Sequence, residues 1–177
     1  MAETHGSKVT VRRAKAEDVP ATAEVHKLAF PRQTFSPEWI DCVFRSFPKS
    51  QLFVAEREGK IVGLIFWTEK SGFRKEAILE LEQIAVHPDY QDRGIGAELI
   101  IRSLPCVAEK IAERGAKLGT ILGNTRVDNR ALKLYKRFGV ETVATIPGMF
   151  SADEVFLVIR NVDVSRLVAM GVPRPRR

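Results

Sequence analysis

The stretch LELEQIAVHPDYQDRGIGAEL, residues 79–99, decides the fold that we predict for this chain. Residues 79–86 form an apolar run without proline or glycine, which is typical of a strand. Pro88 ends this run because proline has no backbone N–H to give to a strand partner. Gly94 and Gly96 follow, and a long helical pattern begins directly behind them. The stretch therefore predicts a strand, a glycine-rich turn and a helix.

This junction favours an anion. Glycines allow successive backbone N–H groups to point into one concavity, and the start of a helix adds partial positive charge, which together suit a phosphate. The loop lacks the Gly-Lys-Ser/Thr of a Walker A motif, and it has only two of the three glycines of a dinucleotide fingerprint. A phosphate-bearing ligand of another kind is the remaining interpretation.

Two strings carry a resemblance to a known family. QDRGIG, residues 91–96, resembles the acetyl-CoA pyrophosphate loop of the GNAT N-acetyltransferases. NRALKLYKRFG, residues 129–139, looks like the later segment of the same family that carries a Leu-Tyr pair and ends in glycine. The strings stand in the family's order and at a similar separation, so the chain resembles a GNAT protein over roughly residues 9–160.

The order of predicted elements agrees with this resemblance. Strands are expected at 9–13, 51–58, 60–70, 76–86, 117–122, 141–146 and 154–160, and helices follow Asp18, Ser36, Gly94 and Asn129. Asp18 and Ser36 are candidate helix caps. The fold class is α/β, a mixed and mostly antiparallel sheet of about seven strands with about four helices, as in the GNAT acyl-CoA N-acyltransferase fold.

Length and composition predict one domain. The chain has 177 residues, of which 45% are apolar and 28% charged, as in ordinary globular proteins. We expect a single GNAT domain at 9–161, a flexible start at 1–8 and a basic Pro/Arg-rich tail at 162–177. No apolar run suits a membrane span or a signal peptide. Cys42 and Cys106 lack metal or redox spacing and are expected to be reduced and buried, in a cytoplasmic protein.

The positive charge is concentrated in one segment. Residues 100–140 hold nine Lys and Arg against three Asp and Glu, which accounts for the whole net charge of +6. Such a segment suits either a nucleic acid or a polyanionic cofactor. We favour the cofactor, because the second family string lies in this segment, and nucleic acid is the least favoured partner.

The resemblance implies acetyl transfer from acetyl-CoA to a primary amine, by direct attack in a ternary complex and without a metal. Tyr135 matches the family's general acid, which protonates the leaving thiolate. Glu82 is the candidate base, and Glu80 or a chain of water molecules is the alternative. Glu80 and Glu82 share a face in a regular strand, but a bulge, common in this strand of the family, would change that.

The resemblance also implies the contacts to acetyl-CoA. The backbone of Ile84, Ala85 and Val86 is expected to bond the pantetheine arm. The loop and helix start are expected to hold the pyrophosphate, namely Gln91, Asp92, Arg93, Gly94, Ile95, Gly96 and Ala97, with the Arg93 guanidinium adding a charged contact. Asn129 and Tyr135 complete the set, and Asn124 is a further candidate.

The acceptor is the open question. Phe35, Trp39 and Phe44 could form an aromatic wall, and Met149 and Phe150 lie in a loop where peptide-acetylating relatives often carry aromatics. These features favour a protein N-terminus, a lysine or a small amine. A non-catalytic acyl-CoA-binding module is the alternative function. Homodimers are frequent in the family, so a homodimer is one expectation.

Overall fold

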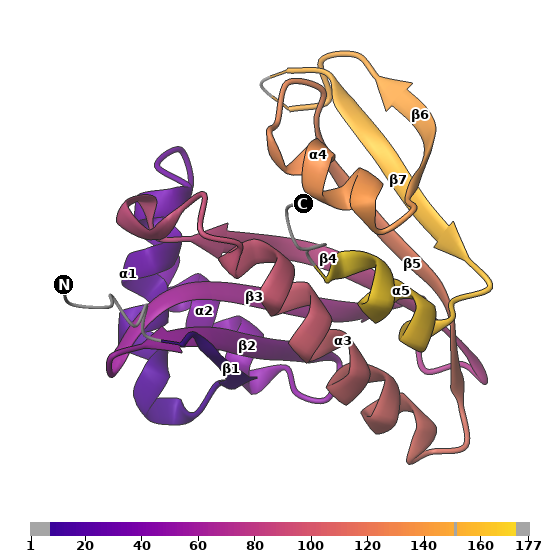
Figure 1. Ribbon diagram of the computed structural model, residues 1–177, viewed down its shortest axis with the longest axis horizontal. Coiled ribbons are helices and arrows are strands. Elements are labelled where there is room, and N and C mark those ends of the chain that lie inside the picture. Colours follow the sequence, from indigo (N-terminus) through magenta and orange to yellow (C-terminus); the bar gives the residue numbers. More distant parts are fainter. Residues whose placement is uncertain (1–7, 151, 173–177) are drawn as a thin grey trace, which may run out of the picture.

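The computed structural model describes residues 8–150 and 152–172, which form a seven-stranded sheet with helices on both faces (Figure 1). The strands are β1 (Thr10–Arg13), β2 (Ser50–Arg57), β3 (Lys60–Lys70), β4 (Glu76–Val86), β5 (Lys117–Arg126), β6 (Glu141–Ile146) and β7 (Glu154–Arg160). The helices are α1 (Val19–Ala29), α2 (Ser36–Arg45), α3 (Ile95–Ala112), α4 (Ala131–Arg137) and α5 (Val164–Gly171), with short 3-10 turns at Ala16–Asp18 and Pro88–Tyr90.

The strand order is β1-β2-β3-β4-β5-β7-β6, and only the β4–β5 pair is parallel. The sheet is therefore mixed and mostly antiparallel, which confirms the predicted fold class. β2 and β3 form the predicted hairpin through Glu58 and Gly59, which both have positive φ (52° and 73°). α3 connects β4 to β5 and returns the chain to the end of the sheet where β4 began, so β5 runs parallel to β4.

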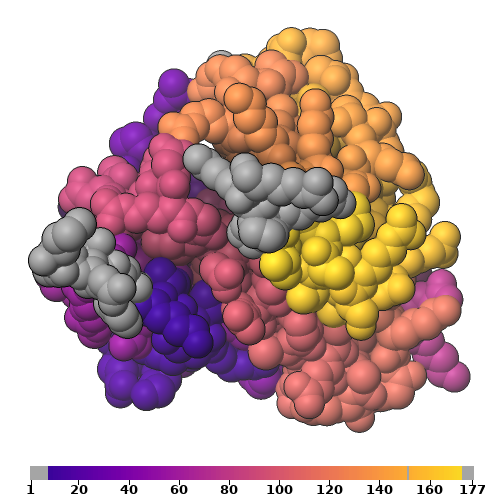
Figure 2. Space-filling view, viewed as in Figure 1, coloured from indigo at the N-terminus to yellow at the C-terminus, as the bar shows by residue number. Residues whose placement is uncertain are grey.

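Two apolar layers fix the sheet between its helices. On one face, α1 and α2 bury a cluster that includes Ile40, Val54 and Phe66. On the other face, α3 and α5 bury a larger cluster that includes Trp67 and Leu104. α3 and α5 lie side by side on the face shown in Figure 2. The functional end of the sheet thus rests on a core that is packed from both sides.

The C-terminal region differs from the sequence prediction. We predicted a tail from residue 162, but Val164–Gly171 form the helix α5. Asp163 caps it by accepting a hydrogen bond from the backbone N of Arg166 (3.0 Å), and Leu167 is buried against the α3 face of the sheet. Residues 173–177, and residues 1–7 of the flexible start predicted at 1–8, lie outside the described residues. The helix was missed because it is short, and its stability comes from packing on α3 rather than from propensity.

Three further local predictions are corrected. Asp18 stands at the start of α1, but its carboxylate accepts no N–H of that helix and instead binds the Arg12 guanidinium (2.6 and 2.9 Å) and the Lys15 backbone N–H (2.7 Å). Ser36 is the first residue of α2 rather than its cap, and its hydroxyl meets His26. Cys42 and Cys106 are exposed rather than buried, because each lies on the outer side of its helix. Within the described part of the chain, no helix is long and apolar enough to cross a membrane.

Candidate active site

The candidate site begins where two neighbouring strands part. β4 and β5 are paired from Glu76–Lys117 to Glu80–Leu122, and their pairing ends there. β4 nevertheless runs on to Val86, while β5 runs on to Arg126 and pairs only with β7. The edge of β4 at residues 81–86 that faces β5 therefore has no strand partner among the described strands. An extended ligand can pair with such an open backbone edge as an added strand.

The glycine-rich loop leads from this edge into α3. Gly94 has φ of 80° and stands immediately before the helix, and Asp92 also adopts positive φ (61°). The helix start has no side-chain cap, and its first intrahelical donor is the N–H of Glu98, which bonds the Gly94 carbonyl (3.1 Å). The N–H groups of Ile95, Gly96 and Ala97 precede that donor and have no partner within the helix. They are therefore available to an anion at the positive end of an 18-residue helix.

An open groove of about 880 Å³ joins this loop to α4. It brings together the two family strings, which lie far apart in the sequence. Gly96 permits the close approach of α4, because a Cβ atom at that position would lie 3.2 Å from Leu134 Cδ2. The lining residues come from the open end of β4, the loop and the α4 region: Ile84, Ala85, Val86, Tyr90, Gln91, Asp92, Gly94, Ile95, Gly96, Arg126, Asp128, Asn129, Arg130, Ala131, Lys133, Leu134 and Arg137.

The groove is positively charged. Its cations are Arg126, Arg130, Lys133 and Arg137, and its carboxylates are those of Asp92 and Asp128. Two of these cations are partly neutralised, since Arg126 bonds Asp128 (2.6 Å) and Arg130 bonds Asp92 across the groove. The remaining positive charge suits a ligand that carries several phosphates. Part of the basic segment noted in the sequence thus lines this groove.

The structure separates the predicted cofactor residues into two groups. Most line the groove, and Gln91 Nε2 also donates to the Val86 carbonyl (3.1 Å), which ties the loop to β4. Arg93 does not line it: its guanidinium donates to the Asp89 carbonyl (2.9 Å), lies over the Tyr90 ring and borders a separate groove beside β1. Ala97 is buried in the first turn of α3. A charged contact from Arg93 to the pyrophosphate is therefore not supported by this arrangement.

The two predicted asparagines both have protein partners. Asn129 lines the groove, but its amide donates to Thr125 Oγ1 (2.7 Å) and accepts from the Ala131 backbone N (2.9 Å). Asn129 therefore caps the backbone where α4 begins, and α4 carries the groove's cations Lys133 and Arg137. Asn124 lies outside the groove, donates to Glu154 Oε2 (3.1 Å) and lines a smaller cavity on the α3 side of the sheet.

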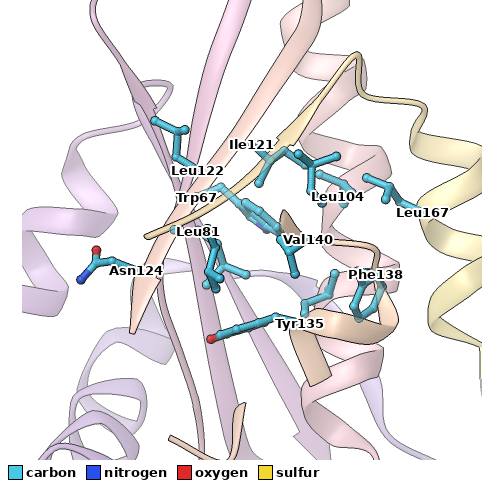
Figure 3. A pocket seen from close by; sticks show the side chains of 14 residues that line it. Trp67, Leu81, Leu104, Ile121, Leu122, Asn124, Tyr135, Phe138, Val140 and Leu167 are labelled. Carbon is cyan, nitrogen blue, oxygen red and sulfur yellow. The ribbon is translucent and has the colours of Figure 1, made fainter. Parts of the chain in front are cut away.

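Tyr135 borders the same small cavity (Figure 3). Its neighbour Leu134 lines the basic groove together with other residues of α4, so α4 separates the two spaces. The phenol hydroxyl forms no hydrogen bond with any residue of the described ranges. Burial raises the pKa of Tyr135 to about 12, because the phenolate would be poorly solvated. The side chain is therefore a protonated donor at neutral pH, and its donor capacity is unused.

Glu82 occupies a β-bulge. Gln83 pairs with Phe66 and Leu81 pairs with Trp67, so Glu82 is the extra residue of β4. The bulge changes the face of the strand: Leu81 packs with the α3-side core, whereas Gln83 bonds to α1 and α2 on the opposite side. Strict alternation, and with it the argument for a shared face of Glu80 and Glu82, therefore ends at this point.

Glu80 is already engaged. Its carboxylate pairs with Lys70 Nζ at 2.8 Å, and this hydrogen bond is the main reason why the pKa of Lys70 is raised. The negative charge of Glu82 also raises the pKa of Lys70, so Glu82 lies near the Lys70–Glu80 pair. Glu82 has no ion pair of its own among the described residues, so its carboxylate, unlike that of Glu80, is not held by a lysine.

A polar network beside Glu82 escaped the sequence analysis. Gln83 Oε1 accepts from His26 Nε2 (2.9 Å) and from Trp39 Nε1 (3.0 Å), and Gln83 Nε2 donates to Gln33 (2.9 Å). It joins α1, the α1–α2 loop and α2 to the bulged part of β4. Its members lie 44 to 57 residues from Gln83 in the sequence, so no local pattern in the sequence could reveal the network.

The predicted aromatic wall is only partly present. Phe35 and Trp39 are exposed by 73% and 39% and border a shallow groove with Gln33, Thr34, Glu38 and Cys42. Phe44 instead packs against the core beneath α2. Met149 and Phe150 are exposed in the β6–β7 loop. Among the described residues, no group of three or more His, Cys, Asp or Glu is placed to hold a metal ion.

An open strand edge, an uncapped helix start and a basic groove define the class of a nucleotide-bearing cofactor site on an α/β fold. Comparison with known proteins identifies the family. The model of the acetyltransferase (GNAT) domain matches residues 48–142, which is more than half of the chain. The chain therefore belongs to the GNAT acetyltransferase family.

Individual relatives agree with this assignment. An uncharacterized N-acetyltransferase of Methanocaldococcus jannaschii is 33% identical over 151 residues, which cover 78% of this chain and 63% of the relative's length. The ribosomal-protein-S18-alanine N-acetyltransferase of Escherichia coli matches with a TM-score of 0.68 and 21% identity, over 87% of this chain and 94% of that one. Arabidopsis thaliana Naa50 in complex with the bisubstrate analogue CoA-Ac-MVNAL matches with a TM-score of 0.65 and 17% identity, over 85% and 97%. At these identities the two structures share the fold and do not select an acceptor.

Proposed function

We propose that this protein transfers an acetyl group from acetyl-CoA to a primary amine. The observation that carries the proposal is the basic groove, because it joins the glycine loop, the uncapped start of α3 and the open edge of β4 to α4. The pyrophosphate would lie at the N–H groups of residues 95–97, with Lys133 and Arg137 nearby. The pantetheine arm would run along residues 84–86 toward the point where β4 and β5 part.

The proposed reaction is direct attack in a ternary complex. The amine nitrogen attacks the thioester carbonyl, the C–S bond breaks, and the thiolate of CoA leaves. Glu82, directly or through water, would accept the proton that the amine must lose. Tyr135 would donate a hydrogen bond to the departing sulfur, since its phenol is protonated at neutral pH and forms no hydrogen bond with the described residues. Acetyl-CoA supplies the acyl group, and no metal takes part in this proposal.

The acceptor side favours a peptide-like amine. The exposed side chains of Phe35, Trp39, Met149 and Phe150 come from the α1–α2 loop, the first part of α2 and the β6–β7 loop, which a peptide backbone could contact. Naa50 was solved with an analogue that joins CoA to a peptide, which makes a peptide N-terminus a reasonable first acceptor to test. A lysine side chain or a small amine is the alternative acceptor.

A panel of acceptors tests the proposal. Release of free CoA thiol from acetyl-CoA should be measured against peptides with free N-termini, the same peptides with blocked N-termini, lysine-containing peptides and small amines. We expect thiol release that requires a free amine and increases with its concentration. Binding of acetyl-CoA without release toward any amine would instead favour a non-catalytic acyl-CoA-binding module. Failure of acetyl-CoA to bind would contradict the assignment of the groove.

A further inference from the structure

A small cavity lined mostly by apolar side chains lies beside Tyr135, on the α3 side of the sheet (Figure 3). Its volume is about 50 Å³. Its walls come from β3, β4, β5, β7, α3, α4 and α5 and from the residues that directly follow α4. The residues that matter here are Trp67, Leu81, Leu104, Asn124, Tyr135 and Leu167. The cavity shares no lining residue with the basic groove. The groove can therefore hold its part of CoA without the cavity.

The lining residues differ in exposure. Leu81, Asn124 and Tyr135 are half-buried, and Leu81 and Asn124 stand just beyond the last β4–β5 pair, Glu80–Leu122. Trp67, Leu104 and Leu167 are 2%, 1% and 5% exposed and form the deep end. The mouth therefore lies beside the phenol that we assign to the leaving sulfur, and the deep end lies under α5.

The interior is suited to hydrocarbon. The Trp67 N–H donates to Ser103 Oγ (2.8 Å), and the Asn124 amide donates to Glu154 (3.1 Å), so these two polar groups already have partners. The other side-chain polar atoms of the lining are the Tyr135 hydroxyl, which lies at the mouth, and Asn124 Oδ1, whose amide points away from the cavity (Figure 3). Apolar cavities of this kind do not hold ordered water and instead bind apolar groups.

We infer that this cavity receives the acyl chain of the donor, and that the protein uses short straight-chain acyl-CoA donors longer than acetyl-CoA. A single water-sized group needs roughly 10–15 Å³ on this measure. The volume of about 50 Å³ therefore takes about three or four such groups. Propionyl and butyryl chains add one and two methylenes to acetyl and fit, whereas an octanoyl chain adds six and does not. The inference rests on the proposed position of the thioester beside Tyr135.

Binding without an acceptor tests the inference independently of turnover. Calorimetric titration should compare acetyl-, propionyl-, butyryl- and octanoyl-CoA for the wild type and for Leu167→Phe, which places a larger ring at the deep end. Leu52→Phe is the matched control, because Leu52 is 4% exposed and lies on the opposite face of the sheet. Leu167→Ala is the second variant, since it enlarges the same end if the larger ring prevents folding.

We expect affinity to increase about fourfold with each methylene from acetyl to butyryl and to fall for octanoyl, because each buried methylene contributes through the hydrophobic effect. Leu167→Phe should abolish the increase and leave acetyl-CoA affinity within about twofold, while Leu52→Phe retains the increase. Leu167→Ala should extend the increase to longer chains.

Other results would overturn the inference. It fails if affinity is constant or decreases from acetyl to butyryl, if Leu167→Phe and Leu52→Phe have the same effect, or if no acyl-CoA binds. The proposed transferase function fails in a different way, namely when chain length and Leu167→Phe control binding as expected but no amine releases thiol from any donor.

Discussion

At the scale of single residues, the chemistry of Tyr135 depends on its proton. Its pKa of about 12 lies above that of an ordinary thiol, about 8.5 for cysteine. Complete proton transfer from this phenol to a thiolate is therefore unfavourable. A hydrogen bond to the sulfur as its negative charge develops is favourable, and it is made only as the C–S bond breaks. We therefore assign Tyr135 the role of a transition-state hydrogen-bond donor.

The choice between Glu82 and Glu80 leads to a direct prediction. Glu82→Gln should lower kcat/KM at neutral pH by about 10²-fold, because the amine then loses its assisted deprotonation. The loss should become smaller as pH rises and more of the amine is free base. Glu80→Gln is the matched control and should have a much smaller effect, since Glu80 is paired with Lys70 (2.8 Å). Initial rates of thiol release between pH 6.5 and 9.5 measure both. Equal losses in the two variants would rule out Glu82 as the specific base.

The residue scale also shows what sequence reasoning can supply. The two family strings locate Tyr135 and the loop glycines, because those residues are fixed by local turn and helix geometry. The strings do not determine where a long side chain points, so Arg93 was placed at the phosphates although its guanidinium contacts Asp89 and Tyr90. The polar partners of Gln83 come from distant segments and have no local signal.

At the scale of elements, the site depends on how α4 meets the start of α3. Arg130 of the α4 region and Asp92 of the loop form an ion pair across the groove, and both side chains are 73% exposed. Asp92 also places a negative charge beside the N–H groups that we assign to the pyrophosphate. This pair therefore opposes the binding of a phosphate, because it neutralises one cation and adds a repulsive charge.

Removing that charge should strengthen binding. Asp92→Asn should tighten acetyl-CoA binding by about 3- to 10-fold in low salt, since it frees Arg130 and removes the repulsion. The gain should shrink as ionic strength rises, because both side chains are exposed and screened. Asp89→Asn is the control, because Asp89 is on the same loop and does not line the groove. Calorimetric titration at two salt concentrations measures the effect. Weaker binding by Asp92→Asn would mean that Asp92 supports the loop more than it repels the ligand.

Elements with a strong hydrophobic periodicity were predicted well, whereas the end of β5 and the whole of α5 were not. β4 was predicted at its observed bounds, because alternation and the Pro88 stop define a strand locally. β5 extends to Arg126, beyond the predicted end at 122, because pairing with β7 continues it past two unfavourable glycines. α5 was missed because eight residues give little helical signal, and only contact with α3 and the core stabilises them.

At the scale of the whole molecule, His26 joins the N-terminal helices to the sheet. It is fully buried, and its Nδ1 lies 2.9 Å from Ser36 Oγ while its Nε2 lies 2.9 Å from Gln83 Oε1. Trp39 donates to the same Gln83 oxygen, so that oxygen is an acceptor, and His26 must donate from Nε2 and accept at Nδ1. Burial lowers the pKa of His26, although hydrogen bonds with Gln83 and Gln33 oppose the shift. The folded protein therefore holds this ring neutral.

This arrangement predicts a dependence of stability on pH. An unfolded histidine has a pKa of about 6.5, so below that pH the unfolded chain binds a proton that the folded chain refuses. The free energy of unfolding should therefore fall below pH 6.5, by up to about 1.4 kcal/mol per pH unit from this group. His26→Gln should show a smaller slope, and His87→Gln controls for loss of a histidine elsewhere. Urea unfolding between pH 5 and 7.5 measures the slopes. An unchanged slope in His26→Gln would contradict the assignment.

The overall architecture was predictable from the order of elements and the family resemblance, but the parting of β4 and β5 was not. It arises from the register of strands that are distant in the sequence: β7 pairs with β5 beyond Leu122, and the bulge at Glu82 redirects β4. The parting produces both the open edge for the cofactor and the mouth of the apolar cavity. These functional spaces are properties of the assembled sheet rather than of any motif.

One measurement tests the central claim most directly: kcat for amine-dependent thiol release from saturating acetyl-CoA, in the wild type and in Tyr135→Phe, with acetyl-CoA affinity measured alongside. Phenylalanine keeps the ring that lines the cavity and removes only the hydroxyl. The account predicts that kcat falls by about 10²-fold or more while acetyl-CoA affinity changes by less than about threefold. An unchanged kcat in Tyr135→Phe would contradict the account, because the reaction would then proceed without the donor around which the site is built.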